Sequence, residues 1–530
     1  MNGAEKALEY IENTDLVRRI WSKDHTVWSP DDSDISSSLG WLDVDSQIDG
    51  LVQYLKNLES FIQSSDARHV VLLGMGGSSL GPRVLRDMLA TDAGYPNLIV
   101  LDSILPGLVK SVTDEIDVSK TIFIVSSKSG ITAETNALYK YFRSIVVDVL
   151  GEKSSGKRFF AITNKDTELE AISRRDLFRD ICLVPPDVGG RYSVLTYFGM
   201  IPAAFIGVDV DVFLGRAAVI QRHCGPETPV RENPGARLGA LLGSMALEGR
   251  NKLTLVTSRS LDSFGTWVEQ LIAESICKDG RGIVPITGEP FVSVDCYGTD
   301  RVFVYIRYDD DENDQIDSEM AKIEAAGHPV IRSNLSDSYN LGAEFYRWQF
   351  ATSVIGALLG VNPFSQPDVE LSKERTNEAL IHHSKYGTAP DTKSSQSFRM
   401  LLSKSRPNDY LAIMVFCEVT DEIKLSLRKL RLALLDKYGL ATTVGYAPGF
   451  LHSTGQMHKG GPDSGLFLQL IADRYEDLAV PDEPYTFGTL TDSQAIGDSG
   501  VLSDLGRRVA TVRLGFDPEK QVLKLIKDIG

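Results

Sequence analysis

The sequence has few cysteines, no long apolar run and no excess of positive charge. Its five cysteines are scattered through 530 residues without a Cys-x-x-Cys pair, which argues against a disulfide framework and favours reduced thiols in a cytoplasmic protein. No apolar run approaches the roughly 18 residues of a membrane span, and the amphipathic N-terminus contains no apolar signal core. The net charge of −17 opposes a nucleic-acid surface. We therefore expect a cytoplasmic protein whose partners include neither membranes nor nucleic acids.

The chain is long enough for several domains, because 530 residues exceed what one hydrophobic core usually supports. From His69 onward, short apolar runs alternate with helical patterns, which predicts parallel sheets covered by helices. Ligands of such sheets bind beyond the carboxyl ends of the strands. We expect a helical segment at 1–65, an α/β unit at 66–215, a second α/β unit at 216–381, a linker or loop at 382–398, and a C-terminal α/β unit at 399–530.

The stretch 121–136 carries the clearest sign of a ligand site. Its first five residues, 121–125, predict a buried strand, and a helical pattern begins at Ala133. Between them, Ser127, Ser129 and Thr132 supply hydroxyl groups and Lys128 supplies a positive charge. Together with the free N–H groups of a helix start, these groups suit a phosphate or another small anion. An ordinary helix capped by Ser or Thr remains the alternative for this stretch on its own.

The loop at 74–82, GMGGSSLGP, follows the first predicted strand of the α/β part. Gly76 and Gly77 allow the backbone to approach a ligand closely, and Ser78 can donate at the start of the next helix. The loop is superficially similar to a dinucleotide-binding fingerprint. Because Ser79 stands where that fingerprint requires its third glycine, we favour a sugar-contacting or phosphate-contacting loop.

Arg191 and Glu274 stand in sequence patterns typical of ligand-binding or catalytic residues, although each alone has an ordinary structural explanation. Arg191 follows two glycines, so a tight turn presents its guanidinium to an anion; alone, it would be a surface arginine. Gln270 and Glu274 are four residues apart and share one face of a predicted helix. Alone, a glutamate near a helix end is expected to be solvated.

Two polar segments follow nearer the C-terminus. Gln366 and Lys373 are seven residues apart, which predicts that both project from one face of a helix. The segment 451–461 contains His452, His458, a lysine and three glycines, and we expect it to be a functional loop. We do not favour metal binding by the two histidines, because no acidic or cysteine ligand is near them in the sequence.

These motifs carry a family resemblance. They read GMGGSSLGP, SKSGIT, GGRYS, QxxxES and NPFxQPxVExxK, in this order between Gly74 and Lys373. In this combination the sequence resembles the glucose-6-phosphate isomerase family, whose members contain two sugar-isomerase (SIS) domains. The segment HSTGQMHKGG is similar to part of the isomerase half of fused transaldolase–isomerase chains. We expect no transaldolase half in this chain, and whether a separate transaldolase partner exists stays open.

The resemblance implies an α/β fold with two SIS domains, each a parallel sheet flanked by helices, plus a C-terminal α/β domain. It implies an isomerase that interconverts glucose 6-phosphate and fructose 6-phosphate by ring opening and proton transfer through a cis-enediol(ate), in glycolysis and gluconeogenesis. It further implies a cytoplasmic homodimer that needs no metal and no cofactor.

The resemblance also implies a role for each matching residue. Glu274 would move the proton between C1 and C2, Arg191 would stabilise the enediolate, and Lys373 would assist ring opening. The phosphate would be held by Ser127, Lys128, Ser129 and Thr132. The remaining residues expected to contact the substrate are Gly76, Gly77, Ser78, Gln270, Gln366 and His452.

The ring-opening histidine departs from the family's pattern. The family commonly carries it in a short polar loop before the NPF motif, often donated by a neighbouring subunit. The only histidine in that region here is His328, and its neighbours do not match. Since imidazole titrates near neutral pH, the C-terminal histidines are candidates as well. We favour His458, with His452 and His328 as the alternatives.

Three other functions compete with this interpretation. An isomerase that also acts on mannose 6-phosphate would use the same enediol. A phosphosugar sensor would keep the 127–132 loop but would not need Glu274, Arg191 and Lys373 together. A nicotinamide-dependent enzyme is opposed by Ser79 in the glycine loop.

Overall fold

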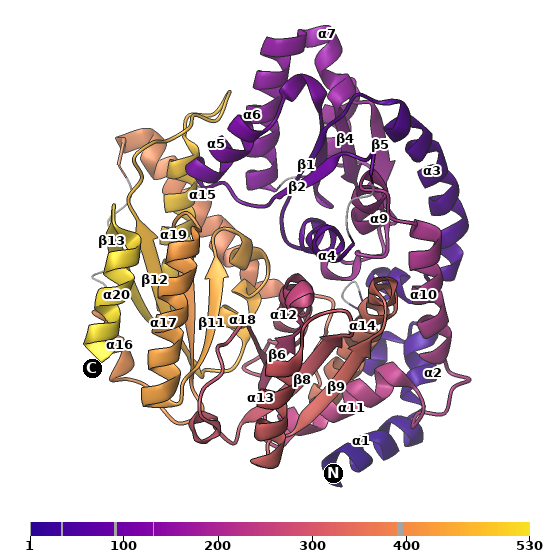
Figure 1. Cartoon of the computed structure of the whole chain (residues 1–530), viewed down its shortest axis with the longest axis vertical. Coiled ribbons are helices and arrows are strands. Elements are labelled where there is room, and N and C mark those ends of the chain that lie inside the picture. Colours follow the sequence, from indigo (N-terminus) through magenta and orange to yellow (C-terminus); the bar gives the residue numbers. More distant parts are fainter. Residues whose placement is uncertain (1, 33–34, 90–92, 131, 389–395, 530) are drawn as a thin grey trace.

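The computed structural model describes residues 2–32, 35–89, 93–130, 132–388 and 396–529 (Figure 1). In these ranges the strands form three sheets, and every strand pair within a sheet is parallel. Helices flank each sheet, so the predicted α/β fold is confirmed. In the same ranges, no helix is long and apolar enough to cross a membrane.

The first sheet positions the loop that follows its central strand β3 and contains Ser127, Lys128, Ser129 and Thr132, here called the serine-rich loop. Its order is β2-β1-β3-β4-β5, and β3 is buried along its whole length. In the described residues, the α-helices α1, α2 and α3 precede this sheet. The strands are β1 (His69–Gly74), β2 (Asn97–Leu101), β3 (Thr121–Ser126), β4 (Phe159–Thr163) and β5 (Asp180–Leu183). The helices are α1 (Asn2–Asn13), α2 (Leu16–Trp21), α3 (Asp45–Ser64), α4 (Leu80–Met88), α5 (Pro106–Glu115), α6 (Ala133–Leu150), α7 (Glu152–Ser155), α8 (Glu168–Arg175), α9 (Tyr197–Phe205) and α10 (Val210–His223).

The second sheet repeats the strand–helix alternation with four strands in the order β7-β6-β8-β9. Helix α12 follows its central strand β6, and helices α11 and α14 pack against each other beside it. The strands are β6 (Lys252–Thr257), β7 (Val284–Thr287), β8 (Arg301–Tyr308) and β9 (Val330–Leu335). The helices are α11 (Pro234–Leu247), α12 (Asp262–Ile276), α13 (Asp314–Ala325) and α14 (Leu341–Leu359).

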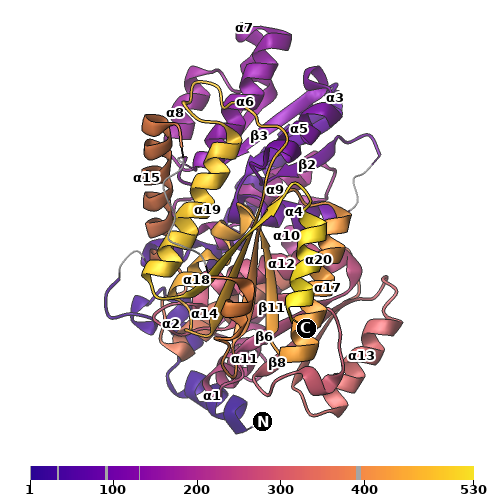
Figure 2. The same cartoon turned by 90° about the vertical axis from the view of Figure 1, so that its left-hand side faces the viewer.

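The third sheet has the order β11-β10-β12-β13. Helix α15, which precedes this sheet in the chain, packs along α19, and Figure 2 shows the two helices side by side. The strands are β10 (Tyr410–Phe416), β11 (Ala441–Tyr446), β12 (Gly465–Ala472) and β13 (Arg508–Gly515). The helices are α15 (Glu370–Tyr386), α16 (Phe398–Leu402), α17 (Asp421–Tyr438), α18 (Gly455–Gly460), α19 (Phe487–Asp504) and α20 (Pro518–Ile529).

Two segments expected to be loops contain helix. Helix α15 continues into the range 382–398 and ends before Gly387, whose φ of 71° is the left-handed conformation that often terminates helices. Residues 389–395 of that range lie outside the described residues. The polar segment 451–461 contains the end of the 3₁₀ helix η12 (Gly449–His452) and the short helix α18. The segment is therefore partly helical despite its three glycines, and not a loop throughout.

The three units share apolar cores. One buried cluster joins the first unit to the second, with Ile124 and Phe345 among its members. Another joins α12 and β7 of the second unit to the third sheet, including Phe467. Val480, between β12 and α19, and Phe487, the first residue of α19, insert into the core of the first unit. The C-terminal unit is therefore packed against both of the others.

Two buried ionisable side chains, Arg431 and Glu269, lie between the second and third sheets. Arg431 on α17 donates to the backbone carbonyls of Thr287 and Thr442, at 2.9 and 2.7 Å. Glu269 on α12 is buried nearby, and burial raises the pKa of its carboxyl to about 8 although Arg431 and Thr287 both lower it. The raised pKa favours the protonated form of this carboxyl, which avoids the large cost of an ion in an apolar interior.

The buried carboxyl makes stability depend on pH. The pKa of Glu269 is higher in the folded chain than in the unfolded chain, so its ionisation destabilises the fold as pH rises from about 5 to about 8. We expect Glu269→Gln, which mimics the protonated acid, to raise the melting temperature relative to wild type, with a gap that widens over that pH range. Thermal unfolding at several pH values measures it. The exposed Glu422→Gln is the control, and an equal gap at every pH contradicts the prediction.

Candidate active site

Arg191 joins the first unit to the second. Its side chain is 3% exposed and follows β5 on a tight turn. Nε donates to Ser275 Oγ at 2.7 Å and Nη1 to Gln366 Oε1 at 2.7 Å. Nη2 donates to the carbonyls of Pro363 and Ser365, at 2.8 and 3.0 Å. Because each nitrogen is engaged, the guanidinium is fixed in one orientation.

Glu274 lies beside this guanidinium on α12. Its Oε1 is 3.3 Å from Arg191 Nη1, and its side chain is 15% exposed. Its Oε2 accepts a hydrogen bond of 3.1 Å from Gln270, whose amide also donates to the carbonyl of His452 at 2.8 Å. The two α12 side chains share a helix face as their spacing predicts. Glu274 is thus a partly buried, oriented carboxylate and not a solvated one.

The glycine loop after β1 makes close contacts that larger residues would prevent. Gly76 has a φ of 55°, and a Cβ on it would lie 2.9 Å from the carbonyl oxygen of His452. A Cβ on Gly77 would overlap the carbonyl oxygen of Gly190. The two glycines thus let the β1 loop lie against the Arg191 turn and the C-terminal unit. Ser78, next in the loop, is 8% exposed.

The serine-rich loop is ordered by its own hydroxyl groups. Ser127 Oγ lies 3.0 Å from Thr132 Oγ1 and accepts a hydrogen bond of 3.1 Å from the backbone N–H of Gly130. Ser129 is exposed, while Ile131 of the same motif lies outside the described residues. Burial lowers the pKa of Lys128, and the charge of Arg191 lowers it further. The loop at the start of α6 therefore places a lysine within electrostatic reach of Arg191.

His452 places part of the C-terminal unit next to Gln270 and Glu134. Its Nε2 lies 2.7 Å from Oε1 of Glu134, which is in the first turn of α6. Gln494 on α19 donates to the same carboxylate oxygen at 2.6 Å. Side chains of the first and third units therefore meet directly beside the Gln270–Glu274 pair.

Glu134 and His452 favour each other's charged forms. Burial alone would raise the pKa of Glu134, but the charge and hydrogen bond of His452 outweigh it and lower that pKa to about 2. Burial alone would lower the pKa of His452, but Glu134 raises it above its usual value, and Glu274 adds to this effect. The carboxylate therefore favours the protonated form of His452, and in that form Nδ1 as well as Nε2 carries a proton.

Comparison with known proteins shows the family to which this chain belongs. The phosphoglucose isomerase family model matches residues 43–285. The glucose-6-phosphate isomerase of Rubrobacter xylanophilus is 31% identical over 367 residues, which span 59% of this chain and 83% of that protein. The chain belongs to the phosphoglucose isomerase family. The glucose-6-phosphate isomerase of Staphylococcus saprophyticus is 27% identical over 383 residues, spanning 64% of this chain and 86% of that protein.

Solved structures agree with this family assignment at the level of the fold. A hypothetical protein from Thermus thermophilus superposes with a TM-score of 0.61 at 25% identity, covering 72% of this chain and 98% of its own. A glucose-6-phosphate isomerase from Chlamydia trachomatis superposes with a TM-score of 0.54 at 19% identity, and the match covers 70% of this chain and 78% of that one. At this sequence identity, the similarity to the second structure is evidence for a shared fold only.

The other two candidate histidines lie elsewhere. The His458 ring is buried between Phe450 and Phe467, with centroid distances of 6.0 and 5.1 Å, and neither nitrogen has a hydrogen-bond partner among the described residues. Burial lowers the pKa of His458 well below its usual value. His328 stands beside aromatic rings just before β9. The structure therefore places His452, and not the favoured His458, beside the side chains of Gln270, Glu274 and Arg191, here called the Glu274–Arg191 group.

Gln366 and Lys373 do not share a helix face as their spacing predicts. Helix α15 begins at Glu370, so Gln366 precedes it and contacts Arg191 instead. Lys373 is in the first turn, 58% exposed, and its Nζ donates to Glu370 Oε1 at 2.7 Å. Its positive charge nevertheless opposes protonation of His452, so Lys373 lies within electrostatic reach of that histidine.

Sequence reasoning did not single out Glu134 or Gln494. Glu134 directly follows the serine-rich loop, and an acid in the first turn of a helix is an ordinary dipole partner, so its position gave no functional signal. Its burial at 3% exposure is the informative feature, because glutamates are almost never buried without a partner. Gln494 lies in the middle of α19 and carries no motif.

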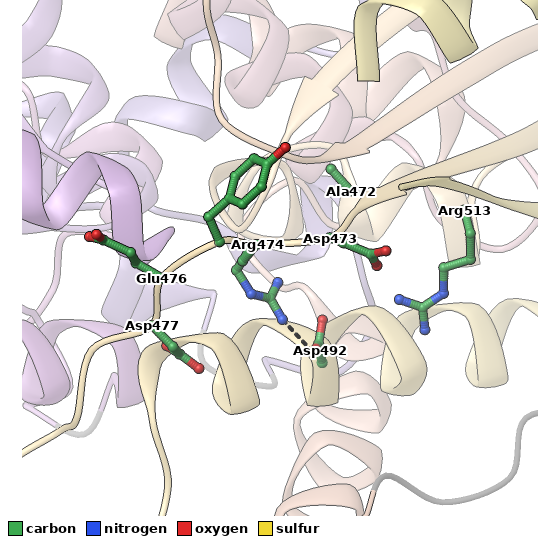
Figure 3. Close-up of a pocket in the computed structure, with 8 residues that line it drawn as sticks. Ala472, Asp473, Arg474, Glu476, Asp477, Asp492 and Arg513 are labelled. Carbon is green, nitrogen blue, oxygen red and sulfur yellow. Dashed lines mark hydrogen bonds and ion pairs between the residues drawn. The ribbon is translucent and has the colours of Figure 1, made fainter. Parts of the chain in front are cut away.

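A separate cavity of about 320 Å³ lies at the carboxyl end of β12 and β13, beside α19 (Figure 3). Carboxylates predominate in its lining, and Arg474 is already paired with Asp492. None of the residues of the Glu274–Arg191 group lines this cavity, so we do not assign the substrate to it. In the described part of the chain, no group of three or more His, Cys, Asp or Glu side chains is placed to hold a metal ion.

Proposed function

We propose that this protein interconverts glucose 6-phosphate and fructose 6-phosphate. The observation that carries the proposal is the oriented carboxylate of Glu274 at 3.3 Å from the buried guanidinium of Arg191. An aldose–ketose exchange needs these two groups, since a proton must leave a carbon next to a carbonyl and negative charge then develops on oxygen. Family membership supports the same reaction.

Glu274 is the base that carries the proton between C1 and C2. One carboxylate can remove the proton from one carbon and return it to the other, because C1 and C2 of a cis-enediol present the same face to that carboxylate. The hydrogen bond from Gln270 and the ion pair with Arg191 hold this carboxylate in one position. Positioning of this kind lowers the barrier by removing the need to align the groups during the reaction.

Arg191 stabilises the enediolate. Its guanidinium is already aligned by Ser275, Gln366 and two backbone carbonyls, so it does not need to reorganise when charge develops. Preorganised donors of this kind contribute roughly 3–4 kcal/mol each in comparable sites. Gly76, Gly77 and Ser78 line the sugar on the side of the β1 loop.

The serine-rich loop anchors the phosphate of the substrate. Ser127, Lys128, Ser129 and Thr132 surround the start of α6, where backbone N–H groups and the helix dipole favour an anion. The anchor is remote from C1 and C2, so its binding energy positions the reacting carbons without taking part in the chemistry.

Ring opening is assigned to His452 in place of His458. As an imidazolium it can protonate the ring oxygen, and the Glu134 carboxylate stabilises the charge it carries before the transfer. Lys373 assists from the first turn of α15, and Gln366 contacts the sugar. The C-terminal unit therefore serves the reaction by supplying this histidine within the same chain.

Further properties of the proposed enzyme follow from the family. We propose a homodimer that acts in the cytoplasm in glycolysis and gluconeogenesis, with a sugar phosphate as its only small-molecule partner. Each step uses a side chain of this protein, so we expect activity without an added metal or cofactor.

A coupled assay of wild-type protein tests the proposal. With fructose 6-phosphate as substrate we expect glucose 6-phosphate as the product, measured by its oxidation in the coupling step. NMR of the same mixture shows whether mannose 6-phosphate accumulates, which is the outcome for a dual isomerase. Binding of fructose 6-phosphate without any turnover contradicts the proposal and leaves a phosphosugar sensor.

A further inference from the structure

Lys278 is a buried lysine next to the proposed active site for which the mechanism above has no role. It follows the C-terminal end of α12 and is 3% exposed. Its Nζ donates to the backbone carbonyl of Ser275 at 2.7 Å and also to the carbonyl of Asn362. The lysine thus ties the end of the helix that carries Glu274 to the segment that begins the NPF motif.

The same two pieces of chain hold Arg191. Its Nε bonds to the side chain of Ser275, and its Nη2 bonds to the carbonyls of Pro363 and Ser365. Lys278 and Arg191 therefore both bridge α12 and the 362–366 segment. If the segment moved, three of the acceptors that orient the guanidinium would move with it, since Gln366 also belongs to the segment.

The environment of Lys278 is costly for an amine. Lysine is almost never fully buried without a partner, and this one donates to two backbone carbonyls. Burial lowers its pKa well below the usual value, and the charge of Arg191 lowers it further while Glu274 opposes the change. In either protonation state the amine has enough N–H groups for the two carbonyl acceptors.

We propose that Lys278 is a positioning residue that fixes the 362–366 segment and, through it, holds Arg191 against the developing enediolate. This inference rests on the isomerase function proposed above. Because Arg191 acts on the transition state, loss of Lys278 should reduce catalysis more than substrate binding. The acceptors of Lys278 lie outside the phosphate anchor, which should be unaffected.

The test compares Lys278→Met with wild type in the coupled assay. Methionine keeps the apolar stem and removes the donors. We expect kcat to fall about thirty-fold while KM for fructose 6-phosphate changes less than about threefold. A sugar-acid phosphate whose carboxylate mimics the enediolate should lose affinity in parallel with kcat, measured by calorimetry. Lys278→Arg, which keeps N–H donors, should recover most of the lost kcat.

Lys252→Met is the matched control. Lys252 is also a buried lysine, 1% exposed and 3.4 Å from Asp300, but it lies at the start of β6. We expect it to lower the melting temperature and leave kcat of the folded protein unchanged. If Lys278→Met does not fold, Lys278→Gln is used, whose shorter amide cannot span both carbonyls, and the same split between kcat and KM is expected.

The outcomes separate the two proposals. Suppose that wild type turns over. If Lys278→Met loses no more kcat than Lys252→Met, the positioning role is overturned and the isomerase function stands. The same conclusion follows if Lys278→Met loses kcat but Lys278→Arg does not recover it. If wild type does not turn over, the proposed function fails and the inference fails with it.

Discussion

Glu274→Gln is expected to lower kcat about 1,000-fold while fructose 6-phosphate still binds. The amide has the shape of the carboxylate but cannot accept the proton from C1 or C2. Binding should persist because the phosphate loop and the glycine loop do not depend on the Glu274 charge. The coupled assay measures turnover and calorimetry measures binding. In D₂O, wild type should exchange the transferred hydrogen with solvent, and the variant should lose that exchange.

Glu269→Gln is the matched control for this prediction. Glu269 lies on the same helix and is buried, but it faces Arg431 and Thr287 on the side of the third sheet. We expect its kcat to stay within about threefold of wild type, because its partners are not part of the proposed site. A Glu274→Gln variant with near wild-type turnover, or an equal loss in both variants, would rule out Glu274 as the base.

His452→Asn is expected to lower kcat/KM for glucose 6-phosphate about 100-fold, because asparagine cannot donate a proton to the ring oxygen. His458→Phe is the matched control from the same short segment, and its packing between Phe450 and Phe467 should tolerate another aromatic ring. We expect it to keep wild-type kinetics. The opposite result, with His458 essential and His452 dispensable, would restore the alternative that the sequence favoured.

The pH profile of the same assay gives an independent measure. Glu134 raises the pKa of His452, so the active imidazolium is lost only as pH rises through that raised value. Glu134→Gln removes the carboxylate charge, and burial then acts against the imidazolium with less opposition. We expect the alkaline limb of kcat/KM to move to lower pH in this variant. An unchanged limb would mean that His452 does not titrate in the reaction.

A mixing experiment tests whether the histidine acts within its own chain. His452→Asn and Glu274→Gln proteins are unfolded together and refolded, so that any dimers contain both chains. Since His452 meets Glu134 and Gln270 of the same chain here, the mixture should show no more activity than its parts. Activity well above that of either variant alone would show that the histidine reaches the neighbouring subunit.

The sequence by itself determined the local features of this protein. Apolar runs such as 121–125 specify buried strands, and Ser127 to Thr132 mark the loop where a parallel strand feeds a helix. Topology then requires such loops to lie at the carboxyl edge of a sheet, so the location of the proposed phosphate loop was predictable from residues close in the chain. The four-residue spacing of Gln270 and Glu274 fixed a shared helix face for the same reason.

Only the tertiary structure decided which distant groups meet. His452 and His458 lie in one short polar segment, and the sequence did not show that one ring contacts Glu134 while the other packs between two phenylalanines. Gln366 and Lys373 have helical spacing, yet the helix begins between them. Glu134 and Lys278 carry no local signal because their roles come from burial, and burial depends on how the three units pack against one another.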